Sequence, residues 1–368
     1  MCDSSYSRPS IHARTAPPKV AQERVAVAEA TVQAALPALL AAADICSKRW
    51  IWEQYDYQVR TNTVAGPGAD AAIVRIKETG TSIAMSLDGN GRYCYLSPRE
   101  GAMLAVAESC RNLSTVGAQP VAATNCLNFG NPERPEIMAQ LVEAIEGIGE
   151  ACRYFDTPIT GGNVSLYNET LGEGIYPTPV IGVVGLLKTG PPVGIAFRNP
   201  GRTVMLLGGF GPSDEKRFGS TQYAKVILGQ LWGLPPALDM DREKRVQNAI
   251  REIVNEGLVE SAHDLSDGGL AVALAECAFG GVGARIELDS ELRPDLLLFH
   301  EGPSRVLVST SQPEKVAALA AKHGIEAPAV GVTIEKEIEV RRQRASLGRW
   351  EIAALKLAYE QALESHVR

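Results

Sequence analysis

The sequence lacks paired cysteines, an excess of positive charge and any long apolar run. Its seven cysteines form no C-x-x-C pair and are odd in number, which is typical of reduced, mostly buried thiols in a cytoplasmic protein. The net charge is −7, which argues against nucleic acid or an anionic membrane surface as the main partner. A phosphorylated small molecule remains compatible, because backbone amides and Mg²⁺ bind phosphate whatever the net charge.

Segments that direct a chain to or across a membrane are also missing. The first ten residues have neither a basic start nor an apolar core, so they do not form a secretion signal. The longest apolar run, residues 32–45, contains Pro37 and is too short to span a bilayer. No repeat of solenoid length is visible. A chain of 368 residues is nevertheless long enough for two domains with full cores.

One stretch, residues 97–132, carries the densest signals. Ser97 and Glu100 form an S-x-x-E capping box around Pro98, which predicts the start of a helix. Glu108 and Asn112 follow one helical turn apart. A carboxylate and an amide oxygen at that spacing can hold a hard cation such as Mg²⁺, and the alternative is a solvated Glu/Asn pair. Apolar residues at helical spacing predict a buried stripe beside the pair, consisting of Met103, Val106, Ala107, Cys110 and Leu113.

The segment after this helix predicts a short strand and a polar turn. Gly117 ends the helix, Pro120 prevents its return, and residues 121–124 form the strand. Residues 125–132, N-C-L-N-F-G-N-P, are then expected to turn, and their three asparagines are costly unless they bind something. Cys126 lies in this turn with no histidine near it in sequence, so we interpret it as a packing cysteine rather than a nucleophile.

The rest of the chain alternates predicted helices and strands. Residues 1–20 are typical of an arm or linker, and an Ala-rich helix at 22–47 is expected to bend or restart at Pro37. Residues 190–193 indicate a domain boundary. Before it, we expect strands at 70–76, 82–87 and 180–187, a tight turn at 88–92 and a helix from Pro135. Beyond it, we expect strands at 203–208, 305–309 and 338–342, and helices near Thr221, at 241–257, at 271–279, around Val316 and around Trp350.

Two further polar segments are candidate binding loops. Residues 157–170, T-P-I-T-G-G-N-V-S-L-Y-N-E-T, contain adjacent glycines that let backbone amides approach a ligand. Residues 261–270, S-A-H-D-L-S-D-G-G-L, place Asp264, Ser266 and Asp267 just before a helix. Simple capping is the alternative, although one cap does not require three such groups and two glycines. We interpret His263 as a packed or capping imidazole.

These motifs together resemble one family. They cover about residues 45–345 in the order Q-Y-D-Y-Q-V, A-V-A-E-S-C-R-N-L, C-L-N-F-G-N-P, G-G-N-V-S-L-Y-N-E-T, Y-P-T-P-V-I-G-V-V-G and A-H-D-L-S-D-G-G-L. The sequence is similar to the second half of the phosphoribosylformylglycinamidine synthase large subunit. That resemblance implies one aminoimidazole ribonucleotide synthetase-like module, with an α/β amino-terminal domain and an α+β carboxy-terminal domain. We therefore expect an arm and helix at 1–45, domains at 46–190 and 195–346, and a terminal helix at 347–368.

The resemblance also implies two sets of site residues. The first set matches Mg²⁺ ligands of the nucleotide site in the second half of the long single-chain form: Asp70, Glu108, Asn112 and Asp264. Ser266 matches a nucleotide contact of that site. The second set matches an ATP contact, an Mg²⁺ ligand and a substrate contact of the short form: Gly162, Asn163 and Ser165. Asn125 stands where the short form usually has an ATP-contacting aspartate, which removes one negative charge near Mg²⁺.

The family reaction belongs to de novo purine biosynthesis. ATP activates the formamide oxygen of formylglycinamide ribonucleotide, and glutamine-derived ammonia then displaces phosphate. The family's catalytic histidine lies in the first half and has no counterpart here, so the resemblance implies part of an ATP-dependent ligase. It further implies ATP or ADP with Mg²⁺ as ligands. The expected partners are a first-half polypeptide or a second copy of the chain, a glutaminase subunit and a small bridging subunit.

Two other functions stay open. One is a self-dimerising, kinase-like ATP-dependent enzyme of the same superfamily, and the other is a non-catalytic nucleotide-binding scaffold. The absence of a catalytic histidine or a motif-placed reactive cysteine argues against the kinase-like enzyme.

Overall fold

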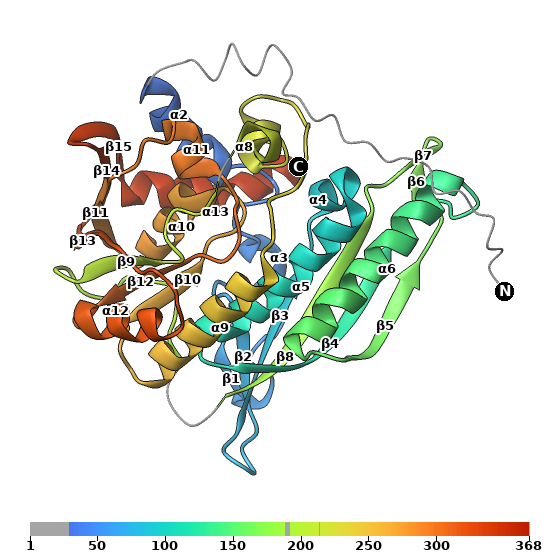
Figure 1. Cartoon of the computed structure of the whole chain (residues 1–368), viewed down its shortest axis with the longest axis horizontal. Helices are drawn as coiled ribbons and strands as arrows, with labels where there is room; N and C mark the ends of the chain where they lie inside the picture. Colours follow the sequence, from blue (N-terminus) through green and yellow to red (C-terminus); the bar gives the residue numbers. More distant parts are fainter. Residues whose placement is uncertain (1–28, 188–191, 213, 368) are drawn as a thin grey trace.

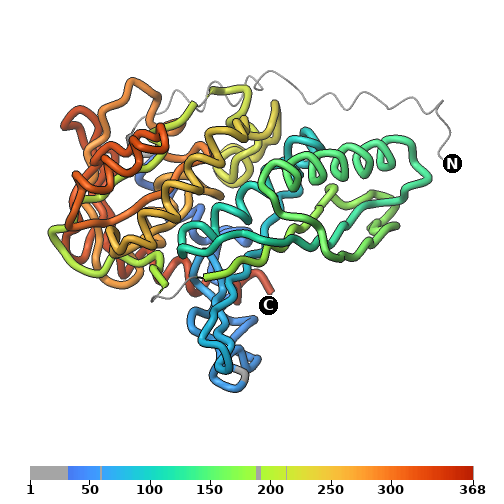
Figure 2. The backbone as a smooth tube through the Cα atoms, turned by 60° about the horizontal axis from the view of Figure 1, so that its bottom comes forward, coloured from blue at the N-terminus to red at the C-terminus, as the bar shows by residue number. Residues whose placement is uncertain are grey.

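The structure is a computed structural model that describes residues 29–187, 192–212 and 214–367. The chain folds into two mixed sheets with covering helices. The sheet of residues 63–187 and the sheet of residues 203–351 lie side by side (Figure 1), and Figure 2 shows the same arrangement from another side. The predicted combination of α/β and α+β domains is therefore confirmed. Among the helices of the described residues, none has both the length and the apolar character needed to cross a bilayer. The six cysteines within these ranges are all free, as expected.

The first sheet has six strands in the order β1-β2-β3-β8-β4-β5. β4 and β5 pair in parallel, and the other neighbours are antiparallel. Helices α5 and α6 cover one face of this sheet (Figure 1). The strands are β1 (Thr63–Ala65), β2 (Ala72–Arg75), β3 (Ser82–Asp88), β4 (Gln119–Asn128), β5 (Ile159–Ser165) and β8 (Thr178–Leu187). The helices are α3 (Arg49–Trp52), α4 (Gly91–Leu96), α5 (Pro98–Thr115) and α6 (Pro135–Phe155), and a small ribbon pairs β6 (Glu169–Thr170) with β7 (Glu173–Gly174).

Helix α5 is buried along nearly its whole length, because it packs against α6, the first sheet and helix α9 (Met240–Asn255) of the second domain. Most of its predicted apolar stripe is fully buried. The predicted capping box is wrong. Ser97 occupies the N-cap without a side-chain cap bond, and the Glu100 carboxylate instead accepts a hydrogen bond from Arg217 at 3.2 Å.

The second sheet has seven strands in the order β10-β12-β9-β13-β11-β14-β15, and only β11 and β14 pair in parallel among them. The strands are β9 (Thr203–Leu207), β10 (Ser261–Asp264), β11 (Val282–Leu288), β12 (Val306–Thr310), β13 (Ala329–Glu335), β14 (Glu337–Arg342) and β15 (Ala345–Glu351). The accompanying helices are α2 (Glu29–Leu40), α7 (Glu215–Phe218), α8 (Gln222–Val226), α9, α10 (Gly269–Ala278), α11 (Pro294–Phe299), α12 (Pro313–Lys322) and α13 (Ile352–Val367).

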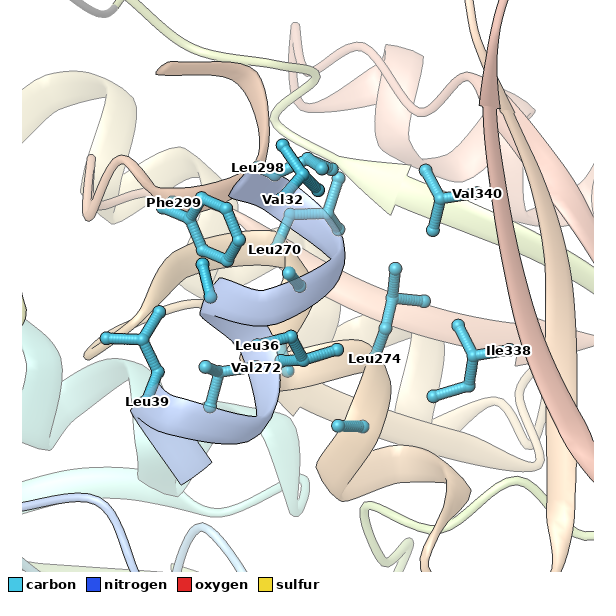
Figure 3. Packing of buried hydrophobic residues seen from close by; sticks show 14 of the residues in the cluster. Val32, Leu36, Leu39, Leu270, Val272, Leu274, Leu298, Phe299, Ile338 and Val340 are labelled. Carbon is cyan, nitrogen blue, oxygen red and sulfur yellow. The ribbon is translucent and has the colours of Figure 1, made fainter. Parts of the chain in front are cut away.

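The second sheet is buried on both faces around β9. Val204 and Leu206 point into a core shared with α2, α10 and α11, whereas Met205 and Leu207 point into a core shared with α9 and α12. Figure 3 shows residues of the first core, with Leu36 of α2 beside Leu274 of α10. A strand buried on both faces reads as a continuous apolar run, which explains why T-V-M-L-L was recognisable from sequence.

Several predicted boundaries differ from the structure. Helix α2 continues through Pro37 to Leu40 without restarting, and residues 22–28 lie outside the described ranges. The terminal helix begins at Ile352 rather than 347. Trp350 lies in β15 because that strand pairs with β14, and the Trp350 indole N–H donates to the Gln33 carbonyl at 3.0 Å. Three predicted turn or loop segments contain strand: 125–128 in β4, 159–165 in β5 and 261–264 in β10. The proposed boundary at 190–193 lies partly outside the described residues.

Candidate functional site

Acidic side chains of both domains meet where the start of β2 approaches the end of β10. The Asp70 carboxylate accepts hydrogen bonds from the Asp264 backbone N–H at 3.0 Å and from the Thr115 hydroxyl at 2.8 Å. Its other oxygen lies 2.6 Å from His263 Nδ1. Ligand atoms of Asp70, His263 and Asp264 all lie within 4.8 Å of one another. The tertiary structure thus joins two predicted site residues that are far apart in the sequence.

Three more polar residues extend this acidic cluster, which we define as Asp70, Asp88, Glu108, Asn112 and Asp264. Asp88 ends β3, and its Oδ1 accepts a hydrogen bond from Asn112 Nδ2 at 2.9 Å. Burial raises the pKa of Asp88 to about 7, and the nearby charge of Asp264 acts in the same direction. Burial, with the charges of Asp88 and Asp264, also raises the pKa of Glu108 well above its usual value. These carboxylates therefore repel one another, and a bound cation would relieve the repulsion.

Arg111 supplies a buried positive charge beside Asp264 and joins the two domains. Its guanidinium lies 3.0 Å from Glu243 on α9 and 3.1 Å from Asp264, and all three side chains are at most 4% exposed. Burial lowers the pKa of Arg111, but the charges of Glu243 and Asp264 outweigh that effect and raise it. Burial and the charge of Asp70 still raise the pKa of Asp264 to about 6, even with Arg111 beside it. One guanidinium thus does not neutralise the cluster.

Two buried oxygens of the acidic cluster have no hydrogen-bond partner: Asp88 Oδ2 and Asn112 Oδ1. Leaving such an atom unsatisfied costs about 1–3 kcal/mol. Oxygen atoms of carboxylates and amides are the ligands that Mg²⁺ takes, so the residues present fit a hard cation. Glu108 and Asn112 do not form the solvated pair that was the alternative. Sequence reasoning missed Asp88, because the turn D-G-N-G-R explained an aspartate there without any site.

His263 is packed, as one of the sequence interpretations had it. Its Nε2 lies 3.0 Å from Glu276 on α10, and its Nδ1 faces Asp70. Burial lowers the pKa of His263, but the charge of Asp70 and hydrogen bonds to Asp70 and Glu276 raise it well above its usual value. The imidazolium consequently fixes the position of the Asp70 carboxylate through its Nδ1.

Ser266 lies in the loop between β10 and α10, soon after Asp264 of the acidic cluster in the sequence. The alternative that Asp264, Ser266 and Asp267 are simple caps is wrong, because the N-cap of α10 is Gly268, which has no side chain to accept a cap bond. Asp267 instead accepts hydrogen bonds from Asn90 at 3.2 Å and Gln222 at 3.2 Å, and so ties the loop to both domains.

The second set of predicted residues lies on β4 and β5. The parallel register pairs Asn125 with Gly162, Cys126 with Asn163 and Asn128 with Ser165. A Cβ on Gly162 would clash with Asn125 Oδ1, so glycine at this position lets the Asn125 side chain lie against β5. Asn125 also pairs with Ile181, which pairs with Asp88, so these residues form one row on the helix-covered face.

Asn163 and Ser165 point to the opposite face of the first sheet, because side chains alternate along a strand. The structure therefore does not bring Asn163 together with the predicted metal ligands Asp70, Glu108, Asn112 and Asp264. Neither α5 nor α6 covers this second face, which we call the open face. It exposes Met85, Leu87 and Leu186 by 38%, 75% and 47%. Cys126 is half-buried on the same face, 3.7 Å from Asn163 Nδ2.

Family models match both domains of the chain. The AIR synthase related protein N-terminal domain matches residues 68–187, and the AIR synthase related protein C-terminal domain matches residues 199–343. The two matches together cover most of the chain.

Among curated proteins, the phosphoribosylformylglycinamidine synthase subunit PurL of Moorella thermoacetica is 51% identical over 300 residues, which are 80% of this chain and 40% of the relative. The corresponding subunit of Bradyrhizobium sp. is 41% identical over 358 residues, which are 94% of this chain and 48% of the relative. The chain thus spans less than half the length of these two relatives.

Among solved structures, T. maritima PurL complexed with FGAR matches with a TM-score of 0.72 and 22% identity, over 90% of this chain and 54% of that one. PurLQS from Thermotoga maritima matches with a TM-score of 0.62 and 22% identity, over 81% of this chain and 46% of that one. At this identity the likeness establishes the fold.

Proposed function

The chain belongs to the AIR synthase related family, and from this premise we propose that it is the second-half module of a phosphoribosylformylglycinamidine synthase large subunit. In that role it holds a nucleotide with Mg²⁺ and takes part in the ATP-dependent conversion of formylglycinamide ribonucleotide to formylglycinamidine ribonucleotide. The observation that carries the proposal is the acidic cluster with two buried, unpartnered oxygens. The 51% identity to the Moorella subunit supports the substrate class.

The predicted site residues have separate roles in binding the cation and the nucleotide. Asp70, Glu108, Asn112 and Asp264 would hold Mg²⁺, which would offset the negative charge of the nucleotide phosphates. Ser266 would contact the nucleotide from the loop before α10. Arg111 and His263 keep Asp264 and Asp70 in place through hydrogen bonds of 3.1 and 2.6 Å. ATP or ADP as the nucleotide is supported by T. maritima PurL, a structural neighbour solved with each of them.

The open face of the first sheet is the proposed contact with a second module. Exposed Met85, Leu87 and Leu186 give it an apolar surface that a partner can bury. Asn163 and Ser165 face the same way, so they would contact an Mg²⁺–nucleotide and a substrate held together with that partner. Asn125 and Gly162, on the helix-covered face of the same two strands, would contact the ATP. A first-half polypeptide is the occupant we propose, with glutamine-derived ammonia supplied by a glutaminase subunit and with a small bridging subunit in the complex.

Calorimetry with Mg-ADP tests the nucleotide site of the chain. We expect binding heat for the wild type and none for the Glu108→Ala/Asp264→Ala variant, because the double substitution removes two carboxylates of the acidic cluster. The matched control Glu143→Ala/Asp156→Ala removes two acidic residues of α6 and its C-cap, and it should bind like the wild type. Absence of heat and of a thermal shift at millimolar nucleotide would contradict the proposal.

Phosphate release tests the role of the module in turnover. The chain alone should release little phosphate from ATP with formylglycinamide ribonucleotide and saturating ammonium, because none of its predicted site residues is a placed general acid or base. Adding a first-half polypeptide should restore release. Substantial release by the chain alone, lost on Asp264→Ala substitution, would mean that this module is itself catalytic.

A further inference from the structure

Asp88 and Asn112 form a buried pair that the predicted ligand set does not explain. Asp88 ends β3, and its side chain shares a face with Ser86, whose hydroxyl donates to the Ser109 carbonyl of α5 at 2.9 Å. This anchors the end of β3 against α5. Asn112, on the next turn of α5, is only 7% exposed, and its amide N–H donates to Asp88 Oδ1 at 2.9 Å. One end of the Asn112 amide is thereby fixed.

The carbonyl oxygen at the other end of that amide lacks a comparable contact. Asn112 Oδ1 is buried and has no hydrogen-bond partner. Buried asparagines in protein cores generally use both ends of the amide, so a purely structural Asn112 would be an exception. Glu108 lies one turn earlier on the same helix, and so the free carbonyl oxygen and a carboxylate are neighbours on one face of α5.

An asparagine binds a hard cation only through its carbonyl oxygen, because the amino end has no lone pair to offer. The two orientations of the amide differ by a half-turn, and a neighbour must select one. Asp88 Oδ1 accepts the hydrogen bond that Asn112 Nδ2 donates at 2.9 Å, so this contact selects the orientation in which the amino group faces Asp88. We infer that Asp88 is a positioning residue of the cation site, which holds Asn112 with its carbonyl oxygen toward the metal. This inference rests on the proposed Mg²⁺ site.

This role predicts a conflict between binding and stability. Asp88 adds a carboxylate to a cluster that already contains Asp70, Glu108 and Asp264, and one of its own oxygens is buried without a partner. A neutral group of the same shape would suit the metal-free protein at least as well. Replacing Asp88 by asparagine should therefore weaken cation binding without lowering the stability of the metal-free chain.

The experiment titrates the full chain with Mn²⁺, without nucleotide, and follows free Mn²⁺ by electron paramagnetic resonance. For Asp88→Asn we expect about a tenfold loss of affinity, because the new amide no longer selects the orientation of Asn112, together with an unchanged or higher melting temperature without metal. The control Asp289→Asn, an exposed acidic residue outside the cluster, should change neither quantity. A purely structural Asp88 would give the opposite pattern, with lower stability and unchanged Mn²⁺ affinity.

A swapped pair makes the test independent of overall charge loss. In Asp88→Asn/Asn112→Asp, the amide at 88 donates to the carboxylate at 112, which offers an oxygen to the cation in either orientation. We expect this variant to bind Mn²⁺ within about threefold of the wild type, so that the two substitutions are strongly non-additive. A swap as weak as Asp88→Asn, or an Asp88→Asn variant with wild-type affinity, overturns the inference. If the single variant does not fold, the swap decides alone.

The same titration separates this inference from the proposed function. A wild-type chain that binds no Mn²⁺ contradicts both the cation site and the role of Asp88. A wild-type chain that binds Mn²⁺ as tightly as Asp88→Asn retains the proposed site and removes only the positioning role.

Discussion

The buried ion pairs of Arg111 should dominate the coupling between the two domains. Arg111→Met keeps an unbranched side chain but leaves Glu243 and Asp264, which lie 3.0 and 3.1 Å from the guanidinium, without their counter-charge. Removing one partner of a buried ion pair costs about 3–5 kcal/mol. Unfolding entropy of about 2.1 cal/mol/K per residue gives about 0.8 kcal/mol/K for 368 residues, so the melting temperature should fall by about 4–6 °C.

The assay is thermal unfolding followed by circular dichroism at pH 8, without metal or nucleotide. Arg49→Met is the matched control, because the Arg49–Glu53 pair is exposed by 60% and 48% and such pairs contribute about 0.3–0.5 kcal/mol. Burial raises the pKa of Asp264 to about 6, so its ionised form is the costly one and the loss in Arg111→Met should shrink at pH 5. A shift no larger than that of Arg49→Met at pH 8 would refute the reasoning.

Three other perturbations have clear expected outcomes. Glu301 is 4% exposed and burial raises its pKa to about 7. Because this value lies above that of the unfolded chain, stability is lost as the pH rises from about 4.5 through 7, and Glu301→Gln should remove about 3 kcal/mol of that loss in urea titrations. Equal pH dependence in the variant would contradict this. Gly162→Ala should displace Asn125, whose Oδ1 occupies the space that the new methyl group needs, and lower the melting temperature, whereas an unchanged temperature would show that β5 yields freely. Leu87→Asp on the open face should weaken association with a partner module in sedimentation. Leu171→Asp, at an exposed leucine between β6 and β7, should leave the association unchanged. Equal association of both variants would exclude the open face as the contact.

Much of the fold could be predicted because the signals are local. The apolar spacing of α5 and the charged pattern of α9 depend only on residues three or four positions apart, and both helices lie where the sequence predicts them. Strands buried on both faces, such as β9, are continuous apolar runs. These features need no knowledge of distant residues.

The errors share one cause, which is a partner distant in sequence. Glu100 matches a capping box, but Arg217 of the second domain takes its carboxylate. Trp350 lies in a strand rather than a helix because β14 pairs with its segment. Asn125 was expected in a turn, yet it lies in β4 because β5 and β8 hold it from both sides. Pairing of this kind leaves no periodic trace within the segment itself.

The candidate site was likewise predictable only where its residues are close in the sequence. The residue types at Glu108 and Asn112, one turn apart on a helix, were sufficient to suggest a hard cation, because helical geometry alone places them together. Only the tertiary structure brought Asp88 against Asn112, set Asp70 against Asp264 and turned Asn163 to the opposite face of the sheet. The physical reason is that charge and hydrogen-bond energies depend on distance in space. Sequence order determines that distance within a helix or strand, whereas packing between the two domains determines it everywhere else.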